Sequence, residues 1–374
     1  MTRETAKHDL GLRRRDILAA GALGLAAAGA PRLAVAAASP DQLTWALHVS
    51  VPSTWLDPAD TLGIISPFMI LYAVHDAMVK PMPGKLYSPS LAESWSVSED
   101  NLTYEFTIRD GAKFHNGEPV TAEDVKFSFE RYRGAANALM KARIASIDTP
   151  DARHVSFTMK KPWPDFLTFY ATASGAGWIV PKKYVEKVGD EGFKNHPIGA
   201  GPYKFVSFNP GVELVLEAFD GYWRKKPAVK HIVMKVIPDD STRLAALKRG
   251  EVDIAYSVRG ELAKELQQTP GLTLKSVVTQ APSWIYFPEQ WDPKSPWHDL
   301  RVRQAANLAL DRDGMSEALF LGGCKTTNSI VPFTFEYYWQ PPAAVYDPAK
   351  ARKLLAEAGH PSGFDSGPLY VDTS

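Results

Sequence analysis

The chain has 374 residues, of which 45% are hydrophobic and 22% are charged. This balance is that of a globular protein and excludes an intrinsically disordered chain. The 42 basic side chains equal the 42 acidic ones in number, so the formal net charge is zero. Nucleic-acid binding therefore has no support from the overall charge, because phosphate recognition relies on concentrated positive charge.

The first 38 residues have the pattern of an export signal. Arg14 and Arg15 precede an apolar run over residues 17–30, which is too short to span a bilayer comfortably. Ala34 and Ala36 form a small-x-small cleavage site, and Ala36 and Ala38 form a second candidate. Paired arginines before two apolar residues resemble a twin-arginine signal, and a Sec leader is the alternative. We therefore expect a signal peptide over residues 1–38 and a periplasmic mature protein.

The chain has a single cysteine, Cys324, beside a pair of glycines. One thiol excludes an intrachain disulfide and a cysteine-based metal cluster. No nucleophile signature surrounds it, so we interpret it as a small residue near a turn. Because no cysteine stands directly after the leader, we expect no lipid anchor.

Strand and helix patterns alternate along the rest of the chain, which predicts an α/β protein. The clearest strand is residues 102–109, where apolar and polar side chains alternate. Further strands are expected at residues 155–159, 212–216, 232–236, 252–256 and 272–274.

The predicted helices have recognisable ends. Thr121 begins a capping-box-like start, and Ser241 is expected to cap a helix over residues 242–249. Asp299 and Asp347 open two later helices, the second with proline at its first position.

The common catalytic motifs are absent. The sequence contains no HExxH, GxSxG, SxxK or GxxxxGK[ST] pattern. Residues 199–202 (GAGP) are similar to a phosphate loop, but Pro202 lacks the N–H that a phosphate cradle needs, so we interpret them as a structural turn. His115 beside Glu118 is interpreted as a solvated turn histidine rather than half of a metal site. A secreted α/β enzyme stays open as the alternative class.

Several blocks, in order, resemble family 5 of the extracellular solute-binding proteins, the oligopeptide, dipeptide and nickel-binding group. The blocks that carry the resemblance are residues 91–95 (LAESW), 102–110 (LTYEFTIRD), 117–125 (GEPVTAEDV), 199–203 (GAGPY), 222–223 (YW), 243–254 (RLAALKRGEVDI), 299–305 (DLRVRQA), 309–312 (ALDR) and 346–364. The resemblance covers nearly all of residues 43–374.

The resemblance implies a two-lobed periplasmic-binding-protein fold of type II, in the large variant with an extra subdomain in the first lobe. Residues 39–256 are expected to form lobe I, with the subdomain inserted at about residues 67–180. Residues 257–374 are expected to form part of lobe II. Family members are substantially longer, and residues 369–374 read as a strand beginning inside a domain, so we expect the second lobe to be incomplete and to expose part of its core.

The resemblance also suggests ligand contacts. The segment after residues 56–58 (LDP) lines the cleft in peptide-binding members, which transfers to Leu62, Gly63 and Ile64. The family's hinge tyrosine corresponds to Tyr256, and we add Trp178 and Trp284 from their positions. Aromatic walls suit a binder because they give large contact area at low rotamer cost. Residues 286–288 (YFP) depart from the aromatic-asparagine pair common in the family, and Pro288 removes a backbone donor there.

The resemblance implies a monomeric substrate-binding component of an ABC importer, without a cofactor, that captures a peptide or similar small solute and delivers it to a membrane permease. Nickel chelates, opines and oligosaccharides stay open as ligands. A truncated product that neither closes nor binds is the third interpretation.

Overall fold

The computed structural model describes residues 41–63, 67–172, 175–277, 282–335 and 337–367. The predicted leader, with Arg14, Arg15, Ala34 and Ala36, lies outside the described residues, as do Ile64 and the strand expected at residues 369–374. None of the helices in the described part of the chain is long and apolar enough to cross a membrane.

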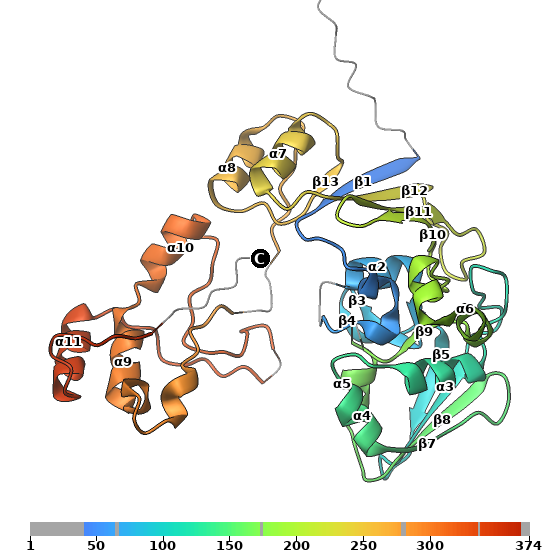
Figure 1. Cartoon of the computed structure of the whole chain (residues 1–374), viewed down its shortest axis with the longest axis horizontal. Coiled ribbons are helices and arrows are strands. Elements are labelled where there is room, and N and C mark those ends of the chain that lie inside the picture. The colour runs from blue at the N-terminus through green and yellow to red at the C-terminus, as the bar shows by residue number, and fades with distance from the viewer. Residues whose placement is uncertain (1–40, 64–66, 173–174, 278–281, 336, 368–374) are drawn as a thin grey trace, which may run out of the picture.

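A five-stranded mixed sheet forms the first layer (Figure 1). Its order is β10-β11-β12-β1-β13; β12, β1 and β13 run parallel, and β10, β11 and β12 run antiparallel. The strands are β1 (Gln42–Leu47), β10 (Tyr203–Asn209), β11 (Glu213–Ala218), β12 (His231–Val236) and β13 (Ile254–Ala255).

Both faces of this sheet are covered. Successive side chains of a strand point to opposite faces, so neighbouring residues of β1 enter different cores. Leu47 lies in the core beneath α2 (Phe68–Val74), with Leu214 and Met234. Ala46 lies in a second core on the opposite face, with Ala246 of α7 (Asp240–Lys248). Helices on both faces of a partly parallel sheet confirm the predicted α/β class.

A four-stranded antiparallel sheet, of order β5-β6-β8-β7, lies within the predicted insertion and has its own aromatic core. Its strands are β5 (Ala92–Val97), β6 (Thr103–Ile108), β7 (Ile144–Asp148) and β8 (His154–Met159), and its helices are α3 (Ala122–Arg131), α4 (Asn137–Arg143) and α5 (Phe166–Tyr170). The alternation at residues 102–109 is confirmed by β6, whose Tyr104, Phe106 and Ile108 are buried.

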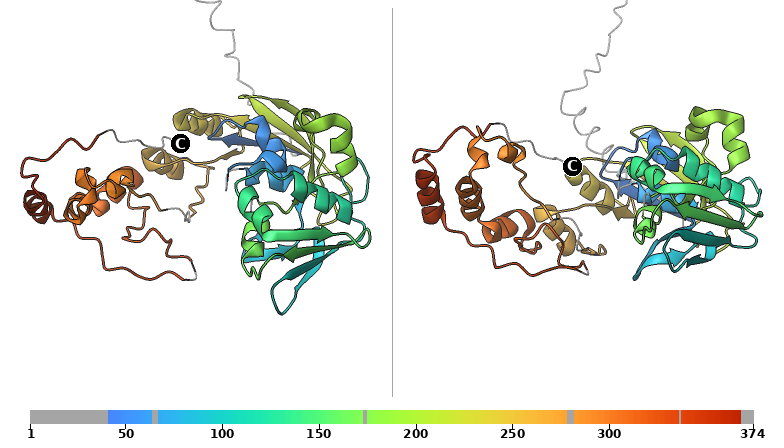
Figure 2. Two further views of the ribbon diagram at one scale, coloured as in Figure 1. Left: turned by 60° about the horizontal axis from the view of Figure 1, so that its bottom comes forward. Right: turned by 90° about the horizontal axis from the view of Figure 1, so that it is seen from below.

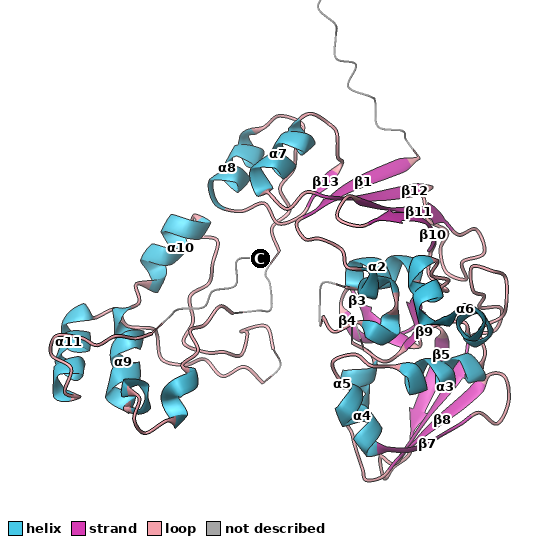
Figure 3. Cartoon of the chain, viewed as in Figure 1, coloured by secondary structure: helices cyan, strands magenta, loops and turns pink. Residues whose placement is uncertain are grey.

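Short elements join these sheets (Figure 3). They are β2 (Asp76–Ala77), β3 (Val79–Met82), β4 (Lys85–Pro89), β9 (Trp178–Ile179), α6 (Lys182–Asn195) and the 3-10 turns η1 (Ser53–Leu56) and η2 (Pro58–Asp60). Asp124 at the start of α3 accepts a hydrogen bond from the Thr121 N–H at 2.9 Å and another from the Lys182 N–H at 2.9 Å, so it ties α3 to α6.

The chain from residue 282 onward is helical and lies apart from the two sheets in both views of Figure 2. After α8 (Gly260–Gln268), which lies beside α7, it contains η3 (Pro288–Trp291), η4 (Pro296–His298), α9 (Leu300–Ala309), α10 (Arg312–Phe320) and α11 (Pro348–Glu357). Val302, Ala305 and Ala351 are buried here, whereas Trp291, Phe335, Tyr337 and Trp339 are exposed. Much of the apolar surface of this part therefore faces solvent.

Three local predictions need correction. Asp239 caps α7, accepting a hydrogen bond from the Thr242 N–H at 2.7 Å, whereas Ser241 donates to the Asp239 carboxylate. Residues 272–274 form no strand, and the strand expected at residues 252–256 is shorter, because only Ile254–Ala255 form β13.

Asp299 and Asp347 are confirmed as the caps of α9 and α11.

Candidate functional site

The parallel strands β12, β1 and β13 end at a common edge of the first sheet. His48 follows β1, Ile237 follows β12 and Tyr256 follows β13. The Ile237 N–H donates to the Leu47 carbonyl at 3.0 Å and the Tyr256 N–H to the Ala46 carbonyl at 3.2 Å. Ligands of open α/β sheets bind outside the carboxyl ends of the strands. We call His48, Ile237–Pro238 and Tyr256–Ser257 the carboxyl edge and treat it as the candidate site.

Tyr256 is the exposed aromatic residue of this edge, with 38% of its surface accessible. Its ring lies 4.9 Å from that of His48 and 6.4 Å from that of Trp45, between centroids. The Trp45 Nε1 and His48 Nδ1 atoms are buried without a hydrogen-bond partner among the described residues. Burial, with smaller contributions from Arg243 and Arg259, lowers the pKa of His48. The edge therefore offers an aromatic wall above a neutral imidazole.

A buried ion pair anchors the segment that leads to Leu62. Arg131 of α3 donates to both carboxylate oxygens of Asp57, at 2.7 and 2.8 Å. The same carboxylate accepts the Ala59 N–H at 3.0 Å, and the Thr61 hydroxyl donates to the Asp57 carbonyl at 3.2 Å. These bonds fix the turn of η2, beyond which Leu62 is 71% exposed and Gly63 is half-buried.

A surface network extends this anchor towards α6. Arg131 also pairs with Asp190 at 2.7 Å, and Arg133 pairs with Asp190 at 2.9 Å and with Asp60 at 2.7 Å. The hydrogen bond from Arg131 lowers the pKa of Asp190. The network holds η2, α3 and α6 together behind the exposed Leu62.

The structure buries Trp178, which is only 2% exposed. Its ring packs edge-on against Tyr72 at 5.1 Å, and the Lys80 ammonium lies 5.6 Å from its centroid. Lys80 pairs with the fully buried Asp76 at 2.7 Å. Nothing in the sequence around Asp76 and Lys80 indicated this pair, because a buried pair is set by tertiary packing.

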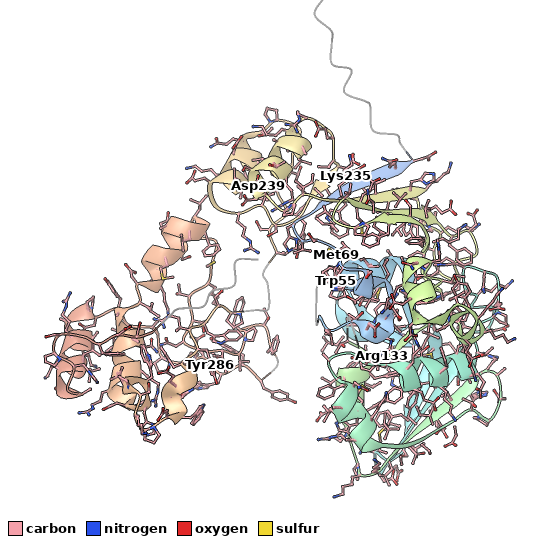
Figure 4. All side chains as sticks on the ribbon, viewed as in Figure 1. Trp55, Met69, Arg133, Lys235, Asp239 and Tyr286 are labelled. Atoms are coloured by element: carbon pink, nitrogen blue, oxygen red, sulfur yellow. The ribbon has the colours of Figure 1, made fainter. Side chains whose placement is uncertain are left out.

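Trp284 is 64% exposed in the segment before η3. The aromatic neighbours of Tyr256 among the described residues are Trp45 and His48, so the structure does not bring Trp284 to the carboxyl edge. Figure 4 shows Tyr286 of the same segment on the helical part, apart from Trp55 and Met69. Phe287 stacks on Trp297 at 4.4 Å, and the described residues beside Pro288 form no strand whose pairing it could weaken.

The turn at residues 199–202 has a structural role, as expected. A Cβ on Gly199 would lie 2.0 Å from the Val74 carbonyl oxygen, so only glycine permits this approach. His115 is not a solvated histidine. Its Nε2–H donates to the Gly201 carbonyl at 3.0 Å and its Nδ1 accepts the Gly199 N–H at 3.2 Å, which pins the turn in place.

The helical part holds a cavity of about 210 Å³. It is lined by Leu310, Asp311, Arg312, Asp313, Thr326, Thr327, Asn328, Gln340, Pro342, Ala343, Ala344 and Tyr346. Within the described ranges, no group of three or more His, Cys, Asp or Glu side chains is placed to hold a metal ion.

Comparisons with known proteins agree with this arrangement. The family model of the bacterial extracellular solute-binding proteins, family 5 Middle, matches residues 87–373. The glutathione-binding protein GsiB of Pectobacterium atrosepticum is 32% identical over 280 residues, which are 73% of this chain and 53% of that protein. The chain thus spans about half the length of the curated relatives it matches.

Two solved structures are similar over most of the chain. The periplasmic binding protein DppA of Helicobacter pylori, in complex with the peptide STSA, has a TM-score of 0.72 at 26% identity and covers 86% of this chain and 67% of its own. MoaA from A. tumefacien R10, in complex with mannopinic acid, has a TM-score of 0.72 at 26% identity and covers 87% and 66%. The predicted periplasmic-binding-protein fold is confirmed, and the chain belongs to family 5 of the bacterial extracellular solute-binding proteins.

Proposed function

We propose that this protein is the periplasmic substrate-binding component of an ABC importer. It captures a peptide or similar small solute between lobe I, residues 39–256, and a second lobe that begins at residue 257, and delivers the solute to a membrane permease. It acts as a monomer and needs no cofactor.

The observation that carries this proposal is the carboxyl edge. Three parallel strands end there, and Tyr256 presents an exposed ring at the point where the chain leaves the sheet. Relatives of similar fold are described with glutathione, a peptide or mannopinic acid as ligand. All three are small polar molecules, which a site with an aromatic wall beside polar groups can hold.

The remaining contacts follow from the segments around this edge. Leu62 and Gly63, just beyond the turn that Asp57 and Arg131 anchor, supply contacts from lobe I. Ile64, which lies outside the described residues, is proposed to contribute with them. Trp284 supplies contacts from the second lobe when the lobes close. Trp178 reaches a ligand only if the packing around Tyr72 and Lys80 opens.

Closure links capture to delivery. A solute that contacts both lobes only in the closed form shifts the population towards that form. The closed form is then the species that docks on the permease. Export precedes this step, and the twin-arginine leader predicts that replacing Arg14 and Arg15 by lysine retains the precursor in the cytoplasm.

Calorimetric titration tests the proposal directly. Purified mature protein is titrated with glutathione, a dipeptide, nickel-histidine and mannopinic acid, and the solute is recovered and identified by mass spectrometry. We expect one solute to bind and raise the melting temperature without being consumed, because a ligand that binds the folded state stabilises it, by about 2.7 kcal/mol at 100-fold excess over Kd. Turnover of a solute, or no binding by any of the four, contradicts the proposal.

A further inference from the structure

Arg243, in the first turn of α7, is a buried arginine whose guanidinium, within the part of the chain that the structure describes, binds backbone carbonyls alone. Its Nε–H donates to the Tyr256 carbonyl at 3.0 Å and its Nη2 to the Ser257 carbonyl at 2.8 Å. Its Nη1 donates to the carbonyls of Ile237 at 2.8 Å and Pro238 at 2.6 Å. Four carbonyls on two chain segments thus converge on one side chain.

The two segments leave the sheet on either side of β1. Ile237–Pro238 follows β12, and Tyr256–Ser257 follows β13, while β1 lies between these strands. Arg243 therefore bridges the carboxyl end of β1 and joins the exits of its two neighbours. The same contact holds the backbone of Tyr256, the aromatic residue of the candidate site.

The bridge also holds an unusual backbone conformation. Ser257 has a φ of 61°, in the left-handed region. A residue with a Cβ pays about 1–2 kcal/mol to adopt this conformation, so surrounding contacts must maintain it. The bond from Arg243 to the Ser257 carbonyl is such a contact, and residue 257 is where we expect the chain to leave lobe I.

No ion pair balances the charge of Arg243 among the described residues. Asp239 and Asp240 lie close enough to favour its charged form, but the Asp239 carboxylate is occupied by Ser241 and Thr242. Burial removes water from the guanidinium and thereby lowers the pKa of Arg243. The four carbonyl dipoles take the place of water as the partners of its charge. Removing the guanidinium leaves four carbonyl oxygens without their donor.

We infer that Arg243 is the positioning residue of the hinge: it fixes the direction in which the chain leaves lobe I at Ser257 and holds Tyr256 at the carboxyl edge. Its importance for solute capture rests on the proposed function, whereas its effect on chain direction exists without any solute. Only an arginine has a planar fork that reaches two segments at once, since lysine offers a single point charge.

A distance measurement between the two parts of the chain tests this role. One spin label is attached to the native Cys324, which is exposed, and one to Lys161→Cys, an exposed position after β8. Double electron–electron resonance is recorded without solute for the wild-type background, Arg243→Lys, Arg243→Gln and Arg249→Gln. Arg249 is the matched control, because it is exposed at the end of the same helix and its side chain binds the neighbouring Glu251.

We expect the wild-type background and Arg249→Gln to share one distance distribution, that of the solute-free form, and both Arg243 variants to show a shifted or broader one. Circular dichroism verifies that each variant keeps its helices. If Arg243→Gln does not fold, the distance distribution of Arg243→Lys tests the inference alone, since this variant keeps the charge and the aliphatic stem. An unchanged distribution in a folded Arg243 variant overturns the inference. Failure of all four solutes to bind contradicts the proposed function alone, because this measurement uses none of them.

Discussion

The two carboxylate oxygens of Asp57 accept hydrogen bonds from the two terminal nitrogens of the Arg131 guanidinium, and the Asp57 side chain is completely buried. The pair joins α3 to the turn that carries Leu62. It is therefore a link between the subdomain and the candidate site, as well as a stabilising contact.

Breaking this pair from one side is expected to be costly. Arg131→Met leaves the Asp57 charge buried with only the Ala59 N–H as a partner, and we expect a loss of about 3–5 kcal/mol in the free energy of unfolding. Urea denaturation measures this loss. Arg133→Met, which removes the two part-exposed ion pairs of Arg133 with Asp60 and Asp190, is the control and should cost about 1 kcal/mol or less. Equal losses for the two variants contradict the account.

Two histidines, the buried His75 and the part-buried His115, predict how stability depends on pH. Burial lowers the pKa of both His75 and His115 from 6.5 to about 4. Between pH 4 and pH 6.5 the unfolded chain binds more protons than the folded one. The contribution of these histidines to the free energy of unfolding is therefore complete above pH 6.5 and is lost as the pH falls towards 4. For His75 the full contribution is about 3 kcal/mol. Urea unfolding at pH 7, 5.5 and 4 should show falling stability, with a shallower slope for His115→Asn; a flat profile refutes this assignment.

Gly199 is expected to be intolerant of any side chain. Gly199→Ala places a Cβ against the Val74 carbonyl, and we expect a loss of about 2–4 kcal/mol or failure to fold. Gly111→Ala is the contrast, because Gly111 has a φ of 73° but open space around it, so only the backbone cost of about 1–2 kcal/mol applies. Thermal unfolding of both variants compares the two; a milder effect at Gly199 disproves the close approach.

Local signals in the sequence predicted much of the secondary structure. The alternation of Tyr104, Phe106 and Ile108, and the caps Asp299 and Asp347, depend on neighbouring residues only. The predicted cap of α7 lay two residues too late, because Asp239 and Ser241 can both accept a hydrogen bond at a helix start. Which of the two caps the helix depends on how β12 ends.

The site was less accessible to such reasoning. An aromatic residue's exposure is decided by distant segments, so nothing near Trp178 indicated that Tyr72 and Lys80 would cover it. Arg243 was noted only as part of a family motif. Its four carbonyl partners follow two different strands, and no spacing rule in the sequence relates them.

The contribution of Tyr256 to solute binding tests the central claim most directly. The calorimetric titration is repeated for Tyr256→Ala and for Tyr87→Ala, whose side chains are both 38% exposed in the parent. Loss of one aromatic contact of about 1.5–3 kcal/mol should weaken binding about 10- to 100-fold in Tyr256→Ala, with the Tyr87 variant unchanged. Equal affinities for wild type and Tyr256→Ala would contradict a solute site at the carboxyl edge.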